Sequence, residues 1–350
     1  MVYTQAQWLL FFFFYCFAGW IWESLYVSGR KRKWVNRGFL YGPLLPIYGF
    51  GAILVLWITL PVRNSLGLIF LFGMIGATVL EYITGAVMER LFHVRYWDYS
   101  NQKCNIHGYI CLTSSLAWGA FSVLLVKCLH LPIEDAVLQI PGHTASLLSM
   151  ALVIAFTIDA TKSVQSALDV RELLREISEN NTLIASFEEK FENAAETFSE
   201  SSEKFRLRIQ EIEAETLEHK NLLRQSSELR GKSVHAFLPE RFDERKNRKA
   251  HFLTLLKEKT DIFLSEIGEL LESETSVSEH EKLSRYQKDF AEFRASLERI
   301  EISVKGRKPK DFKKAASIIR RNPTATSTRF KDSFRELKQF YSFRNKDEEK

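Results

Sequence analysis

The sequence predicts an all-α membrane protein, with a bundle of about five transmembrane helices followed by a long cytoplasmic helical tail. Apolar segments lie at 7–27, 39–60, 66–88, 110–129 and 145–160. Each is about 16–23 residues long, close to the length with which a helix crosses a hydrocarbon core. All seven Trp residues lie before Ser122, and such residues favour the membrane interface. After Thr161 the chain becomes highly charged, so the mean hydropathy of −0.14 averages two unlike halves.

The basic residues between the apolar segments predict the orientation in the membrane. The loop 28–37 is strongly basic, and the loop between the third and fourth segments is also basic, whereas the loop 130–144 has no Lys or Arg. Positively charged loops stay in the cytoplasm. We therefore expect the N-terminus outside the cell, five spans, and a cytoplasmic tail. The first segment lacks a basic n-region and a cleavage site, so we expect an anchor rather than a signal peptide.

The remaining composition argues against several functions. The net charge of +5 is small for 350 residues, which argues against nucleic acid as a partner. His93 and His107 flank Cys104 at a spacing that does not fit a zinc site. No nucleophile and base stand at the spacing of a catalytic motif. We expect no cofactor, no metal and no enzymatic activity.

The entry to the second segment, RGFLYGPLLPIYGFGA, combines several glycines with two prolines, Pro43 and Pro46. Proline removes a helix donor, and glycine permits close packing or unusual backbone. One interpretation is a kinked and tightly packed helix entry. The other is a broken helix that lines a substrate cavity, because irregular backbone at membrane depth must lie beside protein or water. The sequence leaves both open.

Acidic residues within or near the spans form a second candidate site. Glu81, Gly85 and Glu89 are spaced i, i+4, i+8 and share one helix face. A carboxylate within a span needs a partner or a wet cavity. The alternatives are structural ion pairs and a functional polar vestibule, and Arg37 is the expected partner of Glu81. The complete candidate cluster is Glu81, Glu89, Glu23, Arg37 and Asp159.

Two further motifs, RYWDYS and NIHGYICL, follow the third segment, and SSLAWG lies in the fourth. These three motifs come after RGFLYGPLLPIYGFGA and LEYITGAVMERLF. The five motifs in this chain order make the region resemble a bacterial family of ABC-transporter permeases (the CmpB type, or ABC-transporter type IV). The resemblance implies a multi-pass protein of the bacterial cell membrane with a role in transport. By motif position it singles out Gly38, Gly42, Pro43, Pro46, Tyr48, Gly49, Trp97, Asp98, Tyr99, Ser100, Asn105 and Gly108.

The sequence has no G-x-x-x-x-G-K-[ST] motif, which would form a phosphate-binding loop. If ATP powers the protein, a separate subunit must therefore bind it. The resemblance names a transporter, but no residue pattern identifies a substrate.

The tail has two expected parts, which with the transmembrane domain 1–160 give three domains. The part 161–231 is an amphipathic helix, since it has no proline and an apolar residue every seventh position: Ile177, Ile184, Phe191, Phe198, Phe205 and Ile212. Pairing of this 177–212 stripe within the chain, in a homo-oligomer, or with a cytoplasmic partner stays open. The part 232–350 is expected to form helices near 240–272, 278–304, 311–321 and 329–343.

Two functions follow. The first is a permease subunit in the lipid bilayer, acting with a separate ATP-binding subunit. The alternative is a non-transporting membrane scaffold or regulator that recruits cytoplasmic partners through its helical tail.

Overall fold

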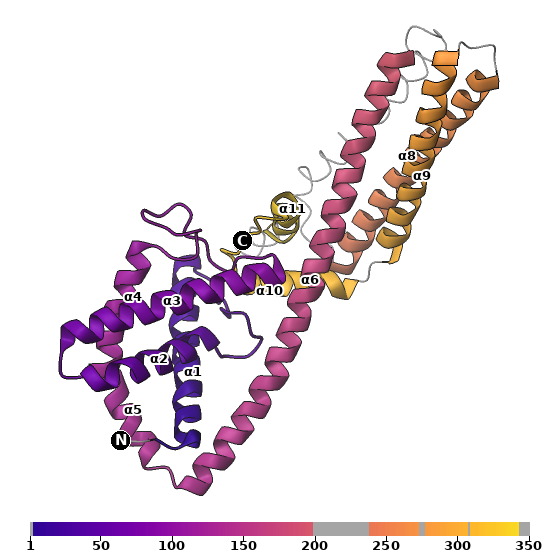
Figure 1. Cartoon of the computed structure of the whole chain (residues 1–350). Coiled ribbons are helices and arrows are strands. Elements are labelled where there is room, and N and C mark those ends of the chain that lie inside the picture. The colour runs from indigo at the N-terminus through magenta and orange to yellow at the C-terminus, as the bar shows by residue number, and fades with distance from the viewer. Residues whose placement is uncertain (1–2, 199–237, 273–276, 307–308, 343–350) are drawn as a thin grey trace. The chain divides into compact units, whose positions relative to one another are not determined.

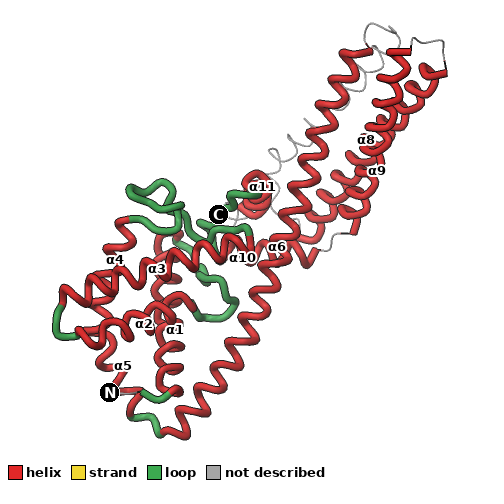
Figure 2. The backbone as a smooth tube through the Cα atoms, in the orientation of Figure 1, coloured by secondary structure: helices red, strands yellow, loops and turns green. Residues whose placement is uncertain are grey.

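A computed structural model describes residues 3–198, 238–272, 277–306 and 309–342. Within these ranges the chain is helix and loop, as Figure 2 shows, and the β-structure is limited to the isolated bridges Arg95–Thr326 and Ile106–Ile110. The predicted all-α class is confirmed. The chain divides into two compact units, which are described separately. The first, here the membrane unit, comprises Met1–Leu174 and Lys313–Tyr341, and the second comprises Arg175–Phe312 and Ser342–Lys350.

The helices of the membrane unit follow the apolar segments (Figure 1). They are α1 (Gln5–Lys31), α2 (Pro46–Thr59), α3 (Leu66–Phe92), α4 (Leu112–Leu124), α5 (His130–Leu138) and α6 (Gly142–Phe198). A 3₁₀ turn, η1 (Leu60–Val62), extends α2, and a π-helical turn, η2 (Leu125–Leu129), joins α4 to α5. Among the described residues, four helical stretches are long and apolar enough to cross a membrane, and Pro46–Val62 is a shorter apolar helix.

The ends of the long helices are set by local capping. Thr4 accepts a hydrogen bond from the backbone N–H of Gln7 at 3.3 Å, and the Gln7 side chain accepts one from Thr4 N at 2.8 Å. This reciprocal pair starts α1. At its other end Arg32 adopts a left-handed conformation, with φ of 50°. At the start of α3 the Ser65 side chain accepts a single hydrogen bond from Leu68 N, and His93 ends the helix with φ of 55°.

The second apolar segment differs from the expectation. A helix was expected over 39–60, but α2 begins only at Pro46, and Leu45 before it is extended. The residue preceding a proline avoids the α-helical region, and proline is favoured at the first helical position, so Pro46 fixes this start. Residues 39–45 form irregular backbone in which Leu40 and Leu45 are buried. This matches the requirement that non-helical backbone at membrane depth be covered by protein.

The fourth segment is longer than expected. It was expected to end at residue 129 in a loop, but helical structure continues through η2 and α5 to Leu138. Apolar positions persist there, and Val137 is buried against the core. The π-helical turn Leu125–Leu129 lies shortly before Pro132. Pro132 cannot donate a backbone hydrogen bond, and π-helical turns occur as single interruptions of this kind within α-helices.

Glycines let the first two helices approach closely. A Cβ placed on Gly49 would lie 2.4 Å from the Cys16 sulfur, and one on Gly19 would lie 2.3 Å from the Tyr48 ring. Both distances are shorter than any real carbon contact. Gly49, in the Gly-rich entry of α2, therefore serves tight packing, whereas Gly51 of the same stretch lines a cavity, so both interpretations of this entry stay open. Phe11 and Leu56, fully buried, lie at the centre of the resulting core.

α6 joins the fifth apolar segment to the tail without interruption, since it runs from Gly142 to Phe198. The expected boundary at residue 160 lies inside this helix, and the compact units divide after Leu174. Ile177, the first residue of the seven-residue repeat, is buried. The side chains of Ile184, Phe191 and Phe198, and all of Phe205 and Ile212, lie outside the described residues. Association through this repeat stays a prediction.

The second unit contains a helical hairpin, α8 (Leu238–Glu272) and α9 (Val277–Gly306). Its core is made by fully buried Leu253, Leu256 and Leu297, and the rings of Phe263 and Phe290 lie 4.4 Å apart. Two shorter helices follow along the chain, α10 (Pro309–Arg321) and α11 (Lys331–Ser342), and most of their residues belong to the membrane unit. The further helices expected in the tail are therefore present.

Candidate functional site

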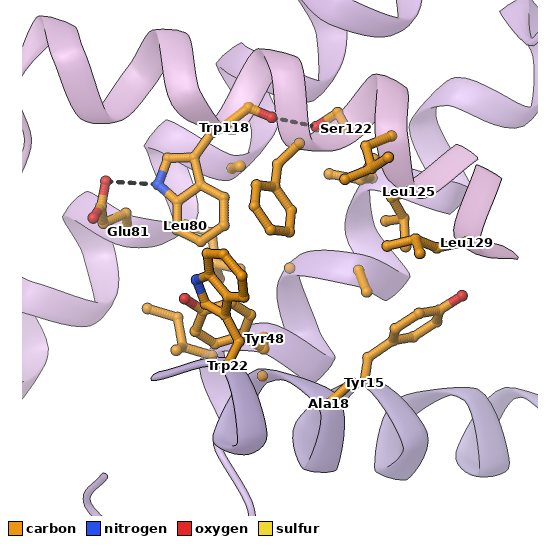
Figure 3. Close-up of a pocket in the computed structure, with 18 residues that line it drawn as sticks. Tyr15, Ala18, Trp22, Tyr48, Leu80, Glu81, Trp118, Ser122, Leu125 and Leu129 are labelled. Atoms are coloured by element: carbon orange, nitrogen blue, oxygen red, sulfur yellow. Dashed lines mark hydrogen bonds between the residues drawn. The ribbon is translucent and has the colours of Figure 1, made fainter. Parts of the chain in front are cut away.

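A cavity of about 400 Å³ lies among the helices of the membrane unit (Figure 3). Each helix contributes one stripe of residues at helical spacing, for example Tyr15, Ala18 and Trp22 from α1, and Trp118, Ser122 and Leu125 from α4 and η2. α2 and α3 supply the remaining wall. The lining is almost entirely apolar, and Glu81 is its one acidic residue.

Glu81 is held by three neutral donors. Its carboxylate accepts hydrogen bonds from Trp118 Nε1 at 3.0 Å, from the Tyr99 hydroxyl at 3.2 Å and from Ser114 Oγ at 3.3 Å. Figure 3 shows the bond to the indole of Trp118. Glu81 is only 5% exposed. A buried carboxylate inside a span requires such partners, and here α4 and the loop 93–111 supply them.

The face of α3 predicted from the i, i+4, i+8 spacing is covered by the loop 93–111. Tyr99 of the loop reaches Glu81, and the Tyr109 hydroxyl donates to Glu89 at 2.6 Å. Between them, a Cβ added to Gly85 would lie 3.0 Å from the Tyr109 ring and 3.3 Å from Trp97. Gly85 thus lets the loop pack closely against α3. Glu81 and Glu89, on either side of it, accept hydrogen bonds from hydroxyl groups of the loop.

The loop has a defined fold of its own. Asp98 accepts hydrogen bonds from the backbone N–H and hydroxyl of Ser100 at 3.0 and 2.5 Å, and Asn105 accepts one from Gly108 N at 3.2 Å. Asp98 and Asn105 therefore stabilise turns within the loop. Gly108 has φ of 73°, and a Cβ on it would lie 2.5 Å from Ser100 Oγ, so only glycine fits there.

An ion pair fastens the loop to the end of α3. Arg95 Nε lies 2.5 Å from Glu89 Oε2, and Arg95 Nη1 lies 3.6 Å from Asp98 Oδ1. Burial acts to raise the pKa of Asp98, but hydrogen bonds from Ser100 and the charge of Arg95 outweigh it, so that the pKa lies below its usual value. Asp98 is therefore a charged structural residue.

Arg37 does not pair with Glu81, contrary to the sequence-based expectation. Its Nε lies 3.8 Å from Glu23 Oε2, and its Nη1 donates to Asn322 Oδ1 at 3.0 Å. Glu23 also accepts a hydrogen bond from the Tyr48 hydroxyl at 2.9 Å. The expectation failed because the neutral donors that satisfy Glu81 come from distant sequence, whereas Glu23 lies within reach of the residue-37 loop.

Asp159 has a different partner from the other acids. Its carboxylate accepts hydrogen bonds from the backbone N–H groups of Tyr41 and Gly42, at 3.0 and 2.8 Å. A Cβ on Gly42 would lie 2.9 Å from the same carboxylate. Asp159 thus ties α6 to the irregular backbone that precedes α2, in which Pro43 also lies. The predicted cluster therefore does not form one site. Glu89, the Glu23–Arg37 pair and Asp159 each make a separate contact between elements, and Glu81 lies in the cavity wall.

A segment far along the chain completes this end of the membrane unit. Residues 321–330, here called the strap, connect α10 to α11. Arg321 is buried and donates to the carbonyl oxygens of Phe39, at 2.8 Å, and Leu40, and its guanidinium lies 4.1 Å from the centre of the Tyr41 ring. Asn322 Nδ2 donates to Gly38 O at 3.0 Å. The irregular backbone before α2 is thus satisfied by the C-terminal part of the chain.

The strap also binds the loop after α3. Arg95 and Thr326 exchange two backbone hydrogen bonds of 2.8 and 2.9 Å. Ser327 Oγ donates to His93 O at 2.6 Å, and the Thr328 hydroxyl donates to Glu89. The predicted helices near 311–321 and 329–343 leave this Thr-rich stretch between them without an assigned role. The run of hydroxyl residues after Arg321 and Asn322 was the sequence feature that could have indicated a hydrogen-bonding segment here.

A second polar cluster was also missed. The Tyr3 hydroxyl donates to Glu134 at 2.5 Å, and the Tyr15 hydroxyl lies 2.9 Å from Nδ1 of the buried His130. These contacts tie the start of the chain to α5, at the end of the membrane unit remote from the strap. No group of three potential metal ligands occurs within the described ranges.

The comparisons with known proteins bear on the region that builds the cavity. Residues 10–164 match the model of the family described as "Putative ABC-transporter type IV". This stretch is therefore similar to that ABC-transporter-related family. The resemblance drawn from the motifs is thereby confirmed, and the match contains the cavity and the loops but not the strap. No curated protein and no solved structure matches the chain.

Proposed function

We propose that the chain is the permease subunit of a transporter in a bacterial cell membrane, and that a separate subunit binds ATP. The observation that carries the proposal is the cavity of about 400 Å³ among membrane-spanning helices, with the Glu81 carboxylate in its wall. Cavities between helices are the usual place for ligands in membrane bundles. The family match supports the transport role, and the absence of a phosphate-binding motif supports a separate ATP-binding subunit. No catalytic role is proposed for this chain.

Affinity purification from native membranes tests this proposal. The tagged chain, extracted in mild detergent, should retain an ATP-binding protein identified by peptide mass spectrometry, and the complex should hydrolyse ATP. An unrelated multi-pass protein with the same tag is the control. Recovery of the chain without any ATP-binding protein and without ATP hydrolysis would contradict the proposal.

The second candidate function is a membrane scaffold, and the α8–α9 hairpin favours it. The hairpin has its own packed core, with Leu253, Leu256 and Leu297 fully buried. Chemical cross-linking in native membranes distinguishes the two functions. Cross-links from 238–306 to a cytoplasmic protein, in cells where no ATP-binding subunit co-purifies, would favour the scaffold.

A further inference from the structure

The cavity has a shape that narrows the class of its ligand. Its lining residues run along each helix rather than around a single level. They extend from Tyr15 to Trp22 on α1 and from Trp118 to Leu129 on α4 and η2. At a rise of about 1.5 Å per residue, these stripes are about 10 and 16 Å long. The space is therefore elongated parallel to the membrane-spanning helices.

Small residues create this space. Ala18, Gly51 and Ala77 lie in the wall on three different helices. A Cβ added to Gly51 would meet only Leu80, at 3.8 Å, which is an ordinary contact distance. Unlike Gly19 and Gly49, Gly51 is thus not needed for helix packing. Its missing side chain leaves room inside the cavity.

The most exposed lining residues show where the cavity opens. Trp22 of α1 is 55% exposed, and Leu124 and Leu129 of α4 and η2 are 43% and 41% exposed. The opening therefore lies between α1 and the α4–η2 stretch, on the side that faces lipid in a membrane. Val55 and Ala77, in contrast, are buried residues of the inner wall.

The chemistry of the wall excludes a strongly polar ligand. The only carboxylate, Glu81, already accepts three hydrogen bonds, and the rest of the lining is almost wholly apolar. A polar headgroup would lose its hydration there without gaining partners. An apolar chain would lose nothing, because it exchanges lipid neighbours for apolar side chains of equal character.

We propose that the cavity binds an acyl chain of a membrane lipid, which enters sideways between α1 and α4 while its headgroup stays outside. The elongated shape, the apolar wall and the lateral opening together carry this assignment. The proposal also names lipid as the substrate class of the transporter, and that part rests on the proposed function. As a ligand of the cavity, the lipid is testable without any ATP-binding subunit.

The test uses the full-length protein in lipid nanodiscs of phosphatidylcholine that contain a small fraction of lipid with a photoreactive diazirine on its acyl chain. After illumination, labelled residues are mapped by peptide mass spectrometry. Residues on the outer surface of the helices will be labelled in any case. Label on the buried Val55 and Ala77 is diagnostic, because only a chain inside the cavity reaches them.

Filling the cavity supplies the matched comparison. Gly51→Leu projects a side chain into the space and should lower the label on Val55 and Ala77 about tenfold, which corresponds to the free energy of overpacking by a few methylenes. Gly67→Leu is the control, because a Cβ at Gly67 meets nothing within 4 Å and the residue does not line the cavity. It should leave the label unchanged.

Two results would overturn the inference. One is wild-type protein labelled only on its outer surface, a measurement that depends on no variant. The other is equal labelling of Val55 and Ala77 in a folded Gly51→Leu protein. If the inner wall is labelled but no ATP-binding subunit co-purifies from native membranes, the ligand stands and the transporter proposal fails. If an ATP-binding subunit co-purifies but the inner wall is not labelled, the transporter proposal stands and only the lipid ligand is rejected.

Discussion

At the scale of single residues, Glu81 shows how a carboxylate is accommodated within a span without an opposite charge. Three neutral donors, from the indole of Trp118 and the hydroxyls of Tyr99 and Ser114, meet its two oxygens. A carboxylate offers about four acceptor positions, so most of its capacity is used. The arrangement makes Glu81 the point at which α3, α4 and the loop 93–111 are joined beside the cavity.

The first prediction is that Glu81→Gln destabilises the protein. The amide presents an NH₂ group to donors that need an acceptor, and the unfolding free energy should fall by about 1–3 kcal/mol. Thermal unfolding in detergent measures the effect. Asp135→Asn is the control, because Asp135 is exposed on α5 and a surface charge contributes little. Equal stability of the Glu81→Gln protein and the wild type would show that these bonds do not support the fold.

A double-mutant cycle identifies the partner. Glu81→Gln combined with Trp118→Phe should cost less than the sum of the single changes, by about 0.5–3 kcal/mol, because the residues are in contact. Exchange of charges by Glu81→Arg with Arg37→Glu should give no rescue, since Arg37 pairs with Glu23 and Asn322 instead. Rescue by that exchange would contradict the contacts described here.

How far the site could be predicted depends on the distance between partners in the sequence. The sequence predicts Glu81 as a candidate because it interrupts an apolar run, and its shared face with Glu89 follows from helical spacing alone. Its donors could not be assigned, because Trp118 lies 37 residues away. The strap was harder still, since Asn322 meets Gly38 across 284 residues. Periodicity describes a helix face but not which distant loop covers it.

At the scale of elements, the helices were predictable and their interruptions were less so. The long apolar segments and the tail helices appear close to the expected positions, because hydrophobic pattern and capping residues act locally. Pro46 fixes the late start of α2 locally, but the irregular backbone before it also needs buried partners, which the strap supplies through Arg321 and Asn322. The π-helical continuation to Leu138 had no local signal strong enough to predict it.

The strap leads to the second prediction. A protease site replacing residues 307 and 308 allows the chain to be cut, after which the fragment beginning at Pro309 should remain bound to the purified fragment 1–306. Arg321→Ala should release it, because buried carbonyl groups of Phe39 and Leu40 lose a charged donor, a loss of about 1.5–3 kcal/mol.

Arg320→Ala is the matched control for the strap, since it removes the same charge from the exposed neighbouring position. The Arg320→Ala fragment should be retained like the wild type. Equal retention of the Arg321→Ala and Arg320→Ala fragments would mean that Arg321 does not anchor the strap.

The hairpin of the second unit carries the third prediction, which concerns pH. Hydrogen bonds from Lys305 Nζ, at 2.5 Å, and Lys257 Nζ, at 2.9 Å, lower the pKa of Glu301 to about 2 from its usual 4.5. A carboxyl whose pKa is lower in the folded state stabilises it above the unfolded pKa. This stabilisation is therefore complete above about pH 4.5 and is lost as the pH falls towards 2.

Hydrogen exchange of α8 and α9 measures the effect. Protection of these helices should fall between pH 4.5 and 2, and Glu301→Gln should remove that dependence. Glu298→Gln is the control, because its carboxylate is half-exposed and pairs with Arg294 only at 3.8 Å. A hairpin whose protection changes with pH equally in the wild type and in Glu301→Gln would contradict the role assigned to this group.

At the scale of the membrane unit, the contacts define two opposite ends. Phe39 and Phe92 have ring centres 5.4 Å apart, and Asp159 binds Tyr41 and Gly42, so the loops before α2 and after α3 lie at one end with the part of α6 around Asp159. Tyr3 binds Glu134 of α5, so the start of the chain lies with the end of α5. α3, with 27 residues, is about 40 Å long and separates the two ends.

The short helix α2 decides the number of crossings. Its 14 residues extend only about 21 Å, less than the roughly 30 Å of a hydrocarbon core. Nevertheless, residues 39–45 begin at the end occupied by Phe92, and the chain reaches Ser65 at the start of α3, about 40 Å away. Irregular backbone and η1 must therefore complete the passage that the helix begins. We therefore predict five crossings, with the N-terminus and the α6 tail on opposite sides of the membrane.

The fourth prediction assigns those sides. The basic residues of 28–37 and 90–103 lie at the strap end, so this end should face the cytoplasm. Single-cysteine proteins test it with an impermeant thiol reagent on intact cells. Cysteines introduced by Gln5→Cys or Asp135→Cys should be labelled, whereas the exposed Cys104 should react only after permeabilisation. Labelling of Gln5→Cys and Cys104 from the same side would mean that α2 turns back without crossing and that the chain has four spans.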